Sequence, residues 1–260
     1  MALLEHTLFE GDRDLVAIAI ERLRAFEPPE GYWLAFSGGK DSQVIYDLAL
    51  KAGVRFEAHY ALTTVDPPEL VRFIRDEYPN VVIDRPERTM WQLIEENRMP
   101  PTRLMRYCCR VLKERGGEGR VVVTGIRAAE SSRRAKRQMV ESCYKVDKRY
   151  LHVIIDWSNE AVWEYHRRYI PKHCCLYDEG WTRIGCVLCP MASRVERDIA
   201  RWPKLAESYR RACGRAWERR HARGDVMDWA DGDAMFEWWI RRDVPEKVDE
   251  AQGELFVWDN

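Results

Sequence analysis

Short apolar runs alternate with segments of helical periodicity over the first two thirds of the sequence. The apolar runs predict strands at residues 32–36, 55–62, 81–84, 120–125 and 151–155. Amphipathic helices are predicted at residues 14–26, 42–51, 67–78, 89–97 and 160–169, with Gly53 ending the second and Asn159 capping the last. The alternation indicates an α/β fold, with a mostly parallel sheet covered by helices on both faces. Ligands of such folds bind at the carboxyl ends of the strands.

The pattern changes after Pro190, where the strand signals stop. Helical spacing recurs at residues 196–202, 205–223 and 234–241. We therefore predict a nucleotide-binding part at residues 1–192 and a helical extension at 193–260. Burial against the first part is expected for the tryptophans of the extension, which are Trp202, Trp217, Trp229, Trp238, Trp239 and Trp258.

Composition limits the classes of protein that fit this pattern. The 260 residues are 46% hydrophobic, which is enough for a sizeable core, and the net charge of −1 gives no overall attraction to nucleic acid. The longest apolar runs are too short to cross a membrane, and the start lacks the features of a secretory signal. These features predict a cytoplasmic protein without a membrane partner. Eight cysteines in such a chain favour metal or redox chemistry over structural disulfides.

The stretch SGGKDS, from Ser37 to Ser42, lies between a predicted strand and a predicted helix. Backbone N–H groups at a helix start attract an anion, and glycines let it approach closely. The stretch is not a Walker loop, because Leu34 and Asp41 stand where that loop requires its first glycine and its Ser or Thr. The sequence therefore predicts a phosphate site of another type.

SGGKDS resembles the PP-loop of the adenine nucleotide alpha hydrolase superfamily, whose members cleave ATP between the α and β phosphates or bind adenylyl-sulfate nucleotides. The resemblance implies that ATP with Mg, or such a nucleotide, is held by Ser37, Gly38, Gly39 and Ser42. It also implies that Lys40 is catalytic and neutralises charge as pyrophosphate leaves. We expect the Lys40 side chain to face solvent or ligand. Asp41 is either a catalytic carboxylate on the magnesium side or a helix cap.

A second stretch, TGIRAAESSR, follows the predicted strand at 120–125 and should emerge at the same edge as the PP-loop. It resembles the TGxR..ES..R segment of the phosphoadenylyl-sulfate (PAPS) reductase family within that superfamily. The resemblance implies that phosphate or sulfate oxygens contact Arg127, as a catalytic residue, and Arg133. It further implies nucleotide-binding roles for Gly125, Glu130, Ser131 and, in the stretch after the strand at 55–62, Asp66.

The cysteines allow two metal sites. Cys186 and Cys189 form a CxxC motif, which together with the nearby pair Cys174 and Cys175 could close a compact zinc site. The pair Cys108 and Cys109, at the start of a probable helix, offers the alternative. The pattern of CC followed by CxxC resembles the iron–sulfur branch of the family, which includes adenylyl-sulfate reductases and the ATP pyrophosphatase of bacterial DNA phosphorothioation. That resemblance implies a 4Fe–4S cluster on Cys108, Cys109, Cys186 and Cys189.

The reductases of this family carry a nucleophilic cysteine near the carboxy terminus, whereas no cysteine follows Cys213 here. We therefore expect an enzyme that uses ATP to adenylate an acceptor for sulfur incorporation, by phosphorothioation or thiolation. A sulfur donor such as a cysteine desulfurase and a nucleic-acid acceptor are the implied partners. The alternatives are a reductase of adenylyl sulfate or phosphoadenylyl sulfate, and a zinc-stapled module that binds nucleic acid through the arginine-rich segments 103–115 and 127–137 without turnover.

Overall fold

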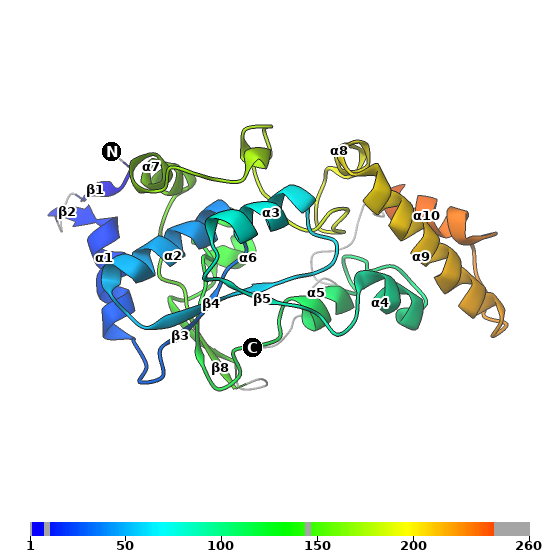
Figure 1. Cartoon of the computed structure of the whole chain (residues 1–260), viewed down its shortest axis with the longest axis horizontal. Helices are drawn as coiled ribbons and strands as arrows, with labels where there is room; N and C mark the ends of the chain where they lie inside the picture. Colours follow the sequence, from blue (N-terminus) through cyan, green and yellow to red (C-terminus); the bar gives the residue numbers. More distant parts are fainter. Residues whose placement is uncertain (1, 8–10, 144–146, 242–260) are drawn as a thin grey trace.

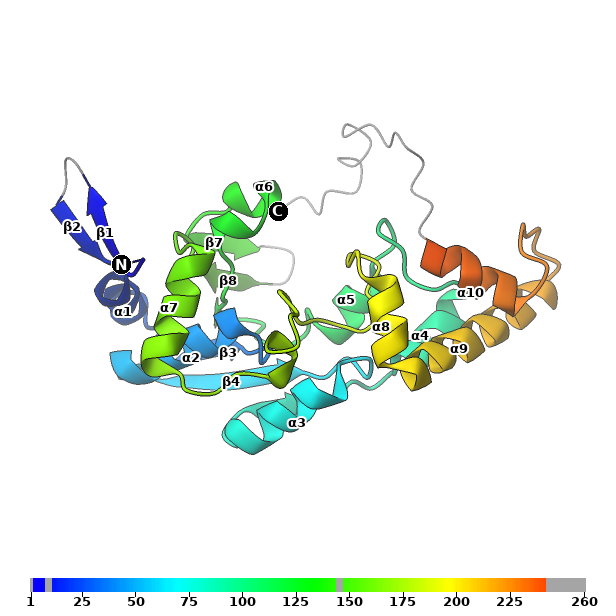
Figure 2. The same cartoon turned by 90° about the horizontal axis from the view of Figure 1, so that it is seen from above.

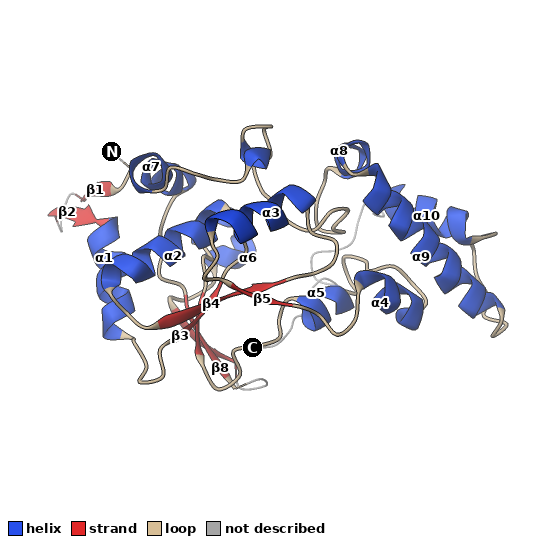
Figure 3. Cartoon of the chain, viewed as in Figure 1, coloured by secondary structure: helices blue, strands red, loops and turns tan. Residues whose placement is uncertain are grey.

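A six-stranded sheet forms the centre of the computed structural model, which describes residues 2–7, 11–143 and 147–241 (Figures 1 and 3). Its strands lie in the order β5-β4-β3-β6-β8-β7, and all pairs are parallel except the antiparallel pair β7 and β8. The strand bounds are β3 Tyr32–Ala35, β4 Phe56–Ala61, β5 Val82–Asp84, β6 Val121–Val123, β7 Val140–Cys143 and β8 Lys148–Leu151. The predicted mostly parallel α/β sheet is confirmed.

Helices cover both faces of this sheet because its connections run in two directions. From β3 to β5 the chain moves one way across the sheet, so the right-handed crossovers put α2 (Lys40–Ala52) and α3 (Pro68–Glu77) on one face. The connection from β5 back to β6 carries α4 (Met90–Asn97) and α5 (Tyr107–Leu112). Reversal of direction places this connection on the opposite face.

Two further helices flank α2 on its own face. They are α1 (Leu15–Ala25) and α7 (Asn159–Tyr169), and both pack directly against α2. A two-stranded antiparallel sheet of β1 (Leu4–Thr7) and β2 (Gly11–Asp14) precedes α1 at one end of the elongated molecule (Figure 2). This hairpin was not predicted.

Capping explains where several helices begin and end. The Asp14 carboxylate accepts hydrogen bonds from the first N–H groups of α1, and Thr89 forms a capping box with Gln92 at the start of α4. Gly53 adopts the left-handed conformation that ends α2, as predicted. The prediction for α7 was wrong by one residue, because Ser158, not Asn159, accepts the capping hydrogen bond.

The strand prediction failed at the far edge of the sheet. β8 ends at Leu151, and residues 152–155 form turns, whereas the apolar run had predicted a strand through 155. Neither β7 nor the start of β8 carries a strong apolar signal, since Glu141 and Lys148 lie within them. Burial explains the error, because Val153 and Ile154 are fully buried in a turn and look like strand residues in sequence alone.

The helical extension is formed by α8 (Val195–Arg201), α9 (Pro203–His221) and α10 (Gly232–Arg241) (Figure 1). The short helix α6 (Ser132–Ala135) follows β6 and lies apart from this extension. Helix α9 packs against α4, and the Trp239 indole donates a hydrogen bond to the Pro101 carbonyl at 2.6 Å. Trp202 and Trp239 are buried as expected, but Trp238 is exposed and Trp258 lies outside the described residues. None of the helices described here has both the length and the apolar character needed to span a membrane.

Helices α9 and α10 meet at two glycines. A Cβ atom on Gly232 would lie 2.3 Å from the Gly214 Cα, whereas a Cβ on Gly214 would have no neighbour within 4 Å. We therefore expect Gly232→Ala to lower the free energy of unfolding by about 1–3 kcal/mol through overpacking. Its matched control Gly214→Ala should raise it by about 0.5–1 kcal/mol, because alanine favours the helix. Denaturant unfolding of both variants is the measurement, and equal effects would contradict the close helix approach.

Candidate nucleotide and cysteine sites

The PP-loop connects β3 to α2 in a turn that only glycine fits. Gly38 has a φ of +70°, and a Cβ atom there would lie 2.6 Å from the Ile74 side chain. The Ser42 hydroxyl donates to the Gly39 carbonyl at 2.8 Å and lies 3.2 Å from the Ser37 hydroxyl. These contacts fix the turn at the start of α2, where the positive end of the helix favours an anion. The Lys40 N–H there donates to the Tyr177 hydroxyl.

Asp41 forms two ion pairs at this turn. Its carboxylate lies 2.8 Å from the Lys40 ammonium and 2.7 Å from the Arg127 Nε. The Lys40 and Arg127 side chains keep 7% and 3% of their surface exposed, so Lys40 does not face open solvent, and its contact with a ligand stays a prediction. The alternative that Asp41 caps the helix was wrong, because Gly39 is the N-cap and Asp41 lies in the first turn of α2.

The TGIR stretch meets the PP-loop at the same sheet edge, as expected from the pairing of β3 with β6. A Cβ atom on Gly125 would lie 3.0 Å from the Asp41 carbonyl, so glycine allows the two loops to touch. Glu130 accepts a hydrogen bond from the Arg127 N–H at 3.0 Å, and Ser131 caps α6. Both therefore shape the loop, and their predicted contacts with nucleotide remain predictions. Arg133 is exposed at this edge.

A cavity of about 190 Å³ opens beside the PP-loop, between the carboxyl ends of β3 and β4 and the segment after α5. Ser37 and Asp66 line it, together with Lys113 and Arg115. The Asp66 carboxylate accepts a hydrogen bond from the Thr63 N–H at 2.7 Å. Two cations beside a phosphate-type turn make this cavity suitable for an anionic ligand.

His59 and Asp84 line the same cavity and were missed from the sequence. The His59 ring stacks on Trp33 with centroids 3.4 Å apart, and its Nδ1 lies 3.0 Å from the Asp84 carboxylate. Its Nε2 is buried without a hydrogen-bond partner among the described residues. With Nδ1 donating to Asp84, a neutral His59 keeps Nε2 as an acceptor. The sequence signal that could have identified this pair is a polar residue near the carboxyl end of each of two adjacent strands.

The cysteine site lies behind this cavity. Hydrogen bonding with Cys109 and the nearness of Cys186 and Cys189 raise the pKa of Cys108. A hydrogen bond from Cys108 and the charge of Arg106 hold the pKa of Cys109 below its usual range, with the Arg106 guanidinium 3.6 Å from its sulfur. Burial, with Asp66 and Cys189 nearby, raises the pKa of Cys186. The two cysteine pairs, far apart in sequence, therefore share one electrostatic neighbourhood.

The other tandem pair lies elsewhere. Burial, together with Cys175 and Glu69, raises the pKa of Cys174. Over the described ranges, no three His, Cys, Asp or Glu side chains stand close enough to hold a metal ion as they are placed. The chemistry of the donor set fits a thiolate-bound cluster, because four thiols lie beside the cations Arg106 and Lys113.

The doubly wound sheet and the SGGKDS turn at its carboxyl edge define a PP-loop nucleotide-binding protein of the α/β class. The model of one family, the phosphoadenosine phosphosulfate reductase domain, matches residues 31–192, which are more than half of the chain. The chain belongs to that family.

Individual relatives are distant. An uncharacterised protein of Methanocaldococcus jannaschii is 29% identical over 208 residues, which cover 74% of this chain and 43% of that protein. Adenosine 5'-phosphosulfate reductase 1 of Bacillus subtilis is 22% identical over 190 residues, 67% of this chain and 75% of that protein. The chain spans less than half the length of the two Methanocaldococcus relatives it matches.

A solved structure shows the same fold. The phosphoadenylyl-sulfate reductase of Candida auris, crystallised as a phosphate complex, superposes with a TM-score of 0.50 at 17% identity. The match covers 65% of this chain and 87% of that one. At this identity the similarity extends to the architecture alone.

Asp41→Asn tests the paired cations. The change leaves Lys40 and Arg127 buried without their shared carboxylate, so we expect a loss of about 3 kcal/mol in the free energy of unfolding. The matched control is Glu57→Gln, which removes the partner of Arg120 from a pair in which Glu57 is 62% exposed. It should change stability by less than about 0.5 kcal/mol. Denaturant unfolding measures both, and an Asp41→Asn protein as stable as the parent would contradict the role of the ion pairs.

Proposed function

We propose that the protein cleaves ATP between the α and β phosphates to adenylate an acceptor, so that sulfur can then replace the acceptor's oxygen. The observation that carries this proposal is the pair of buried cations, Lys40 and Arg127, held by Asp41 at the start of α2. Preorganised positive charge at a helix start stabilises an anion that develops during a reaction. Pyrophosphate is such a leaving group.

The reaction assigns a task to each part of the turn. The acceptor oxygen attacks the α phosphorus, the bond from that phosphorus to the bridging oxygen breaks, and its electron pair leaves with pyrophosphate. Lys40 and the backbone N–H groups after Ser37 neutralise the leaving group, and Arg127 contacts the same phosphates. Asp41 is also the carboxylate that is available to bind the magnesium ion of the nucleotide. The cavity lined by Asp66 and His59 is where we place the nucleotide.

The second part of the proposal is a 4Fe–4S cluster held by Cys108, Cys109, Cys186 and Cys189. When bound, the cluster would supply a site that accepts or relays sulfur. Arg106 and Lys113 would offset the negative charge of a four-thiolate cluster, since the charges of Cys186 and Asp66 already raise the pKa of Lys113. Zinc on the same cysteines is the alternative metal.

The runner-up function is reduction of adenylyl sulfate or phosphoadenylyl sulfate, which the names of several relatives favour. Reduction needs an accessible thiolate that attacks sulfur. Among the described thiols outside the proposed cluster set, Cys213 is fully buried in α9, and burial raises its pKa to about 12. Cys174 is buried as well, whereas Cys175 is exposed and Cys143 is half-buried. Reduction would therefore depend on Cys143 or Cys175, and we place it second to sulfur incorporation.

The proposed partners follow from this chemistry. ATP is the nucleotide, a cysteine desulfurase is a suitable sulfur donor, and a nucleic acid is a suitable acceptor. All eight cysteines are free of disulfides in the structure.

Lys40→Ala tests the cleavage step. Loss of one preorganised cation should slow pyrophosphate release from ATP by roughly 100- to 1000-fold. Because Lys40 is buried against Asp41, the unfolding temperature is measured on the same variant, and Lys172→Ala, with a side chain 66% exposed, serves as the matched control. A folded Lys40→Ala protein that releases pyrophosphate at the parental rate would remove Lys40 from the mechanism. Orthophosphate with ADP as products would refute the PP-loop interpretation.

Metal analysis tests the cluster. Protein purified without oxygen should be brown and contain about four iron and about four sulfide per chain. Cys108→Ser and Cys189→Ser should lose the iron, whereas the matched controls Cys174→Ser and Cys175→Ser should keep it. Zinc in place of iron, or iron loss from the Cys174 and Cys175 variants, would contradict the ligand set proposed here.

A further inference from the structure

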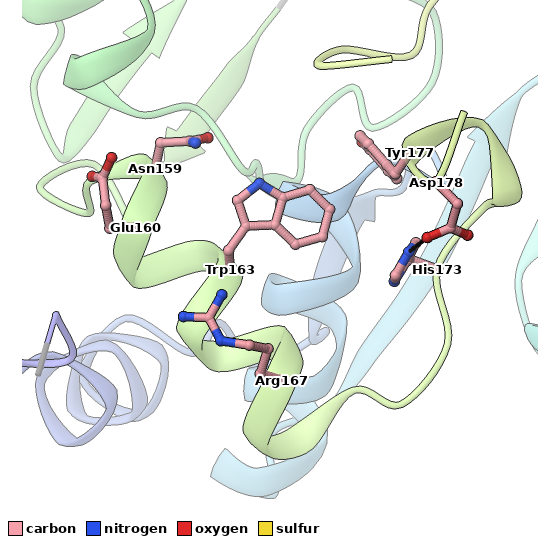
Figure 4. A pocket seen from close by; sticks show the side chains of 7 residues that line it. All are labelled: Asn159, Glu160, Trp163, Arg167, His173, Tyr177 and Asp178. Carbon is pink, nitrogen blue, oxygen red and sulfur yellow. Dashed lines mark hydrogen bonds and ion pairs between the residues drawn. The ribbon is translucent and has the colours of Figure 1, made fainter. Parts of the chain in front are cut away.

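An open cavity of about 450 Å³ lies along α7 (Figure 4). It shares no lining residue with the cavity beside β3 and β4. Figure 4 shows Trp163 in the middle of the site, with the start of α7 on one side and the loop that follows the helix on the other. The lining residues are Asn159, Glu160, Trp163, Arg167, His173, Tyr177 and Asp178.

The Trp163 ring is fixed but not covered by a stacked neighbour. It meets Tyr177 at 5.1 Å and His173 at 5.6 Å, with interplanar angles of 88° and 79°, so both contacts are edge-to-face. The His166 ring lies 5.3 Å away at a tilt of 53°. In Figure 4 the broad face of the indole is turned toward the viewer, between Asn159 on one side and Tyr177 on the other. No hydrogen bond to its N–H comes from the described residues. A planar ring can therefore stack on a platform that is already oriented.

Arg167 supplies a cation one helical turn beyond Trp163 on the same face of α7. Across the described residues it has no acidic partner, while the adjacent Arg168 pairs with Glu164. On the opposite wall, Asp178 pairs with His173 at 2.9 Å. The guanidinium of Arg167 is thus available for an anion beside the aromatic platform.

The cavity borders the PP-loop through one side chain. The Tyr177 hydroxyl accepts a hydrogen bond from the Lys40 backbone N–H at 2.9 Å, at the start of α2. On the same side of α7, a ring nitrogen of His166 lies 2.9 Å from the Lys40 carbonyl. A ligand stacked on Trp163 would therefore lie next to the phosphate turn.

We propose that this cavity binds a nucleotide unit of the acceptor, with its base stacked on Trp163 and its phosphate paired with Arg167. Asn159 and Glu160, at the start of α7, can hydrogen-bond the edge of the base. The assignment to the acceptor rests on the proposed function, whereas the binding of a nucleotide unit does not. Its source is either a free nucleotide or one nucleotide of a strand.

Fluorescence anisotropy of a labelled single-stranded oligonucleotide tests the site. The full chain is first saturated with the α,β-methylene analogue of ATP, which occupies the PP-loop and cannot be cleaved between the α and β phosphates. We expect binding to persist under these conditions. Trp163→Leu and Arg167→Gln should each weaken it by about tenfold or more, the scale of one lost stacking contact, while Trp163→Phe should retain most of it.

The matched controls are Trp238→Ala, an exposed tryptophan outside the cavity, and Arg168→Gln, the adjacent arginine, and both should bind like the parent. Competition by unlabelled UMP as strong as by the oligonucleotide identifies a free nucleotide as the ligand, and competition by the strand alone identifies nucleic acid. No binding by the parent, parental binding by Trp163→Leu, or displacement by the ATP analogue would overturn the site. Pyrophosphate release is assayed separately. If the protein binds the oligonucleotide through Trp163 but does not cleave ATP, the proposed function is refuted and the nucleotide site stands.

Discussion

Asp41 places one carboxylate between Lys40 and Arg127, two buried cations in the loops that follow the neighbouring strands β3 and β6. Burial of like charges this close is unfavourable unless an anion lies between them. Asp41 supplies that anion in the protein itself, and the same arrangement leaves positive potential at the start of α2. At Gly125 a side chain would collide with the Asp41 backbone, so the two loops pack closely against each other.

The sequence predicted most of the central sheet because apolar runs and helical spacing alternate strongly there. The PP-loop, the TGIR stretch and the two distant cysteine pairs were also recognisable, since each is a short pattern of unusual residues. Burial of Lys40 could not be predicted, because it depends on tertiary packing around the start of α2, where Tyr177 contacts Lys40 and Arg127 contacts Asp41. The pairing of His59 with Asp84 and the cavity around Trp163 and His173 could not be predicted either. These sites form only when separate elements meet.

The two tandem cysteine pairs have different surroundings in the fold. In sequence Cys174 and Cys175 stand close to Cys186, which favours a compact metal site. In the fold a 3₁₀ turn at Cys175–Tyr177 directs Tyr177 toward the PP-loop, and Cys174 neighbours Glu69 instead. The chain between Tyr177 and Cys186 thus links the phosphate turn to the cysteine site. Nucleotide chemistry and sulfur chemistry would then take place at two ends of one segment.

The most direct test of sulfur incorporation is a comparison of two products on one anaerobic preparation. Sulfite is measured with adenylyl sulfate or its 3′-phosphate and thioredoxin, and pyrophosphate is measured with ATP and candidate acceptors. The account predicts pyrophosphate without sulfite. Steady sulfite release that is abolished by Cys143→Ser or Cys213→Ser would contradict it and establish a reductase.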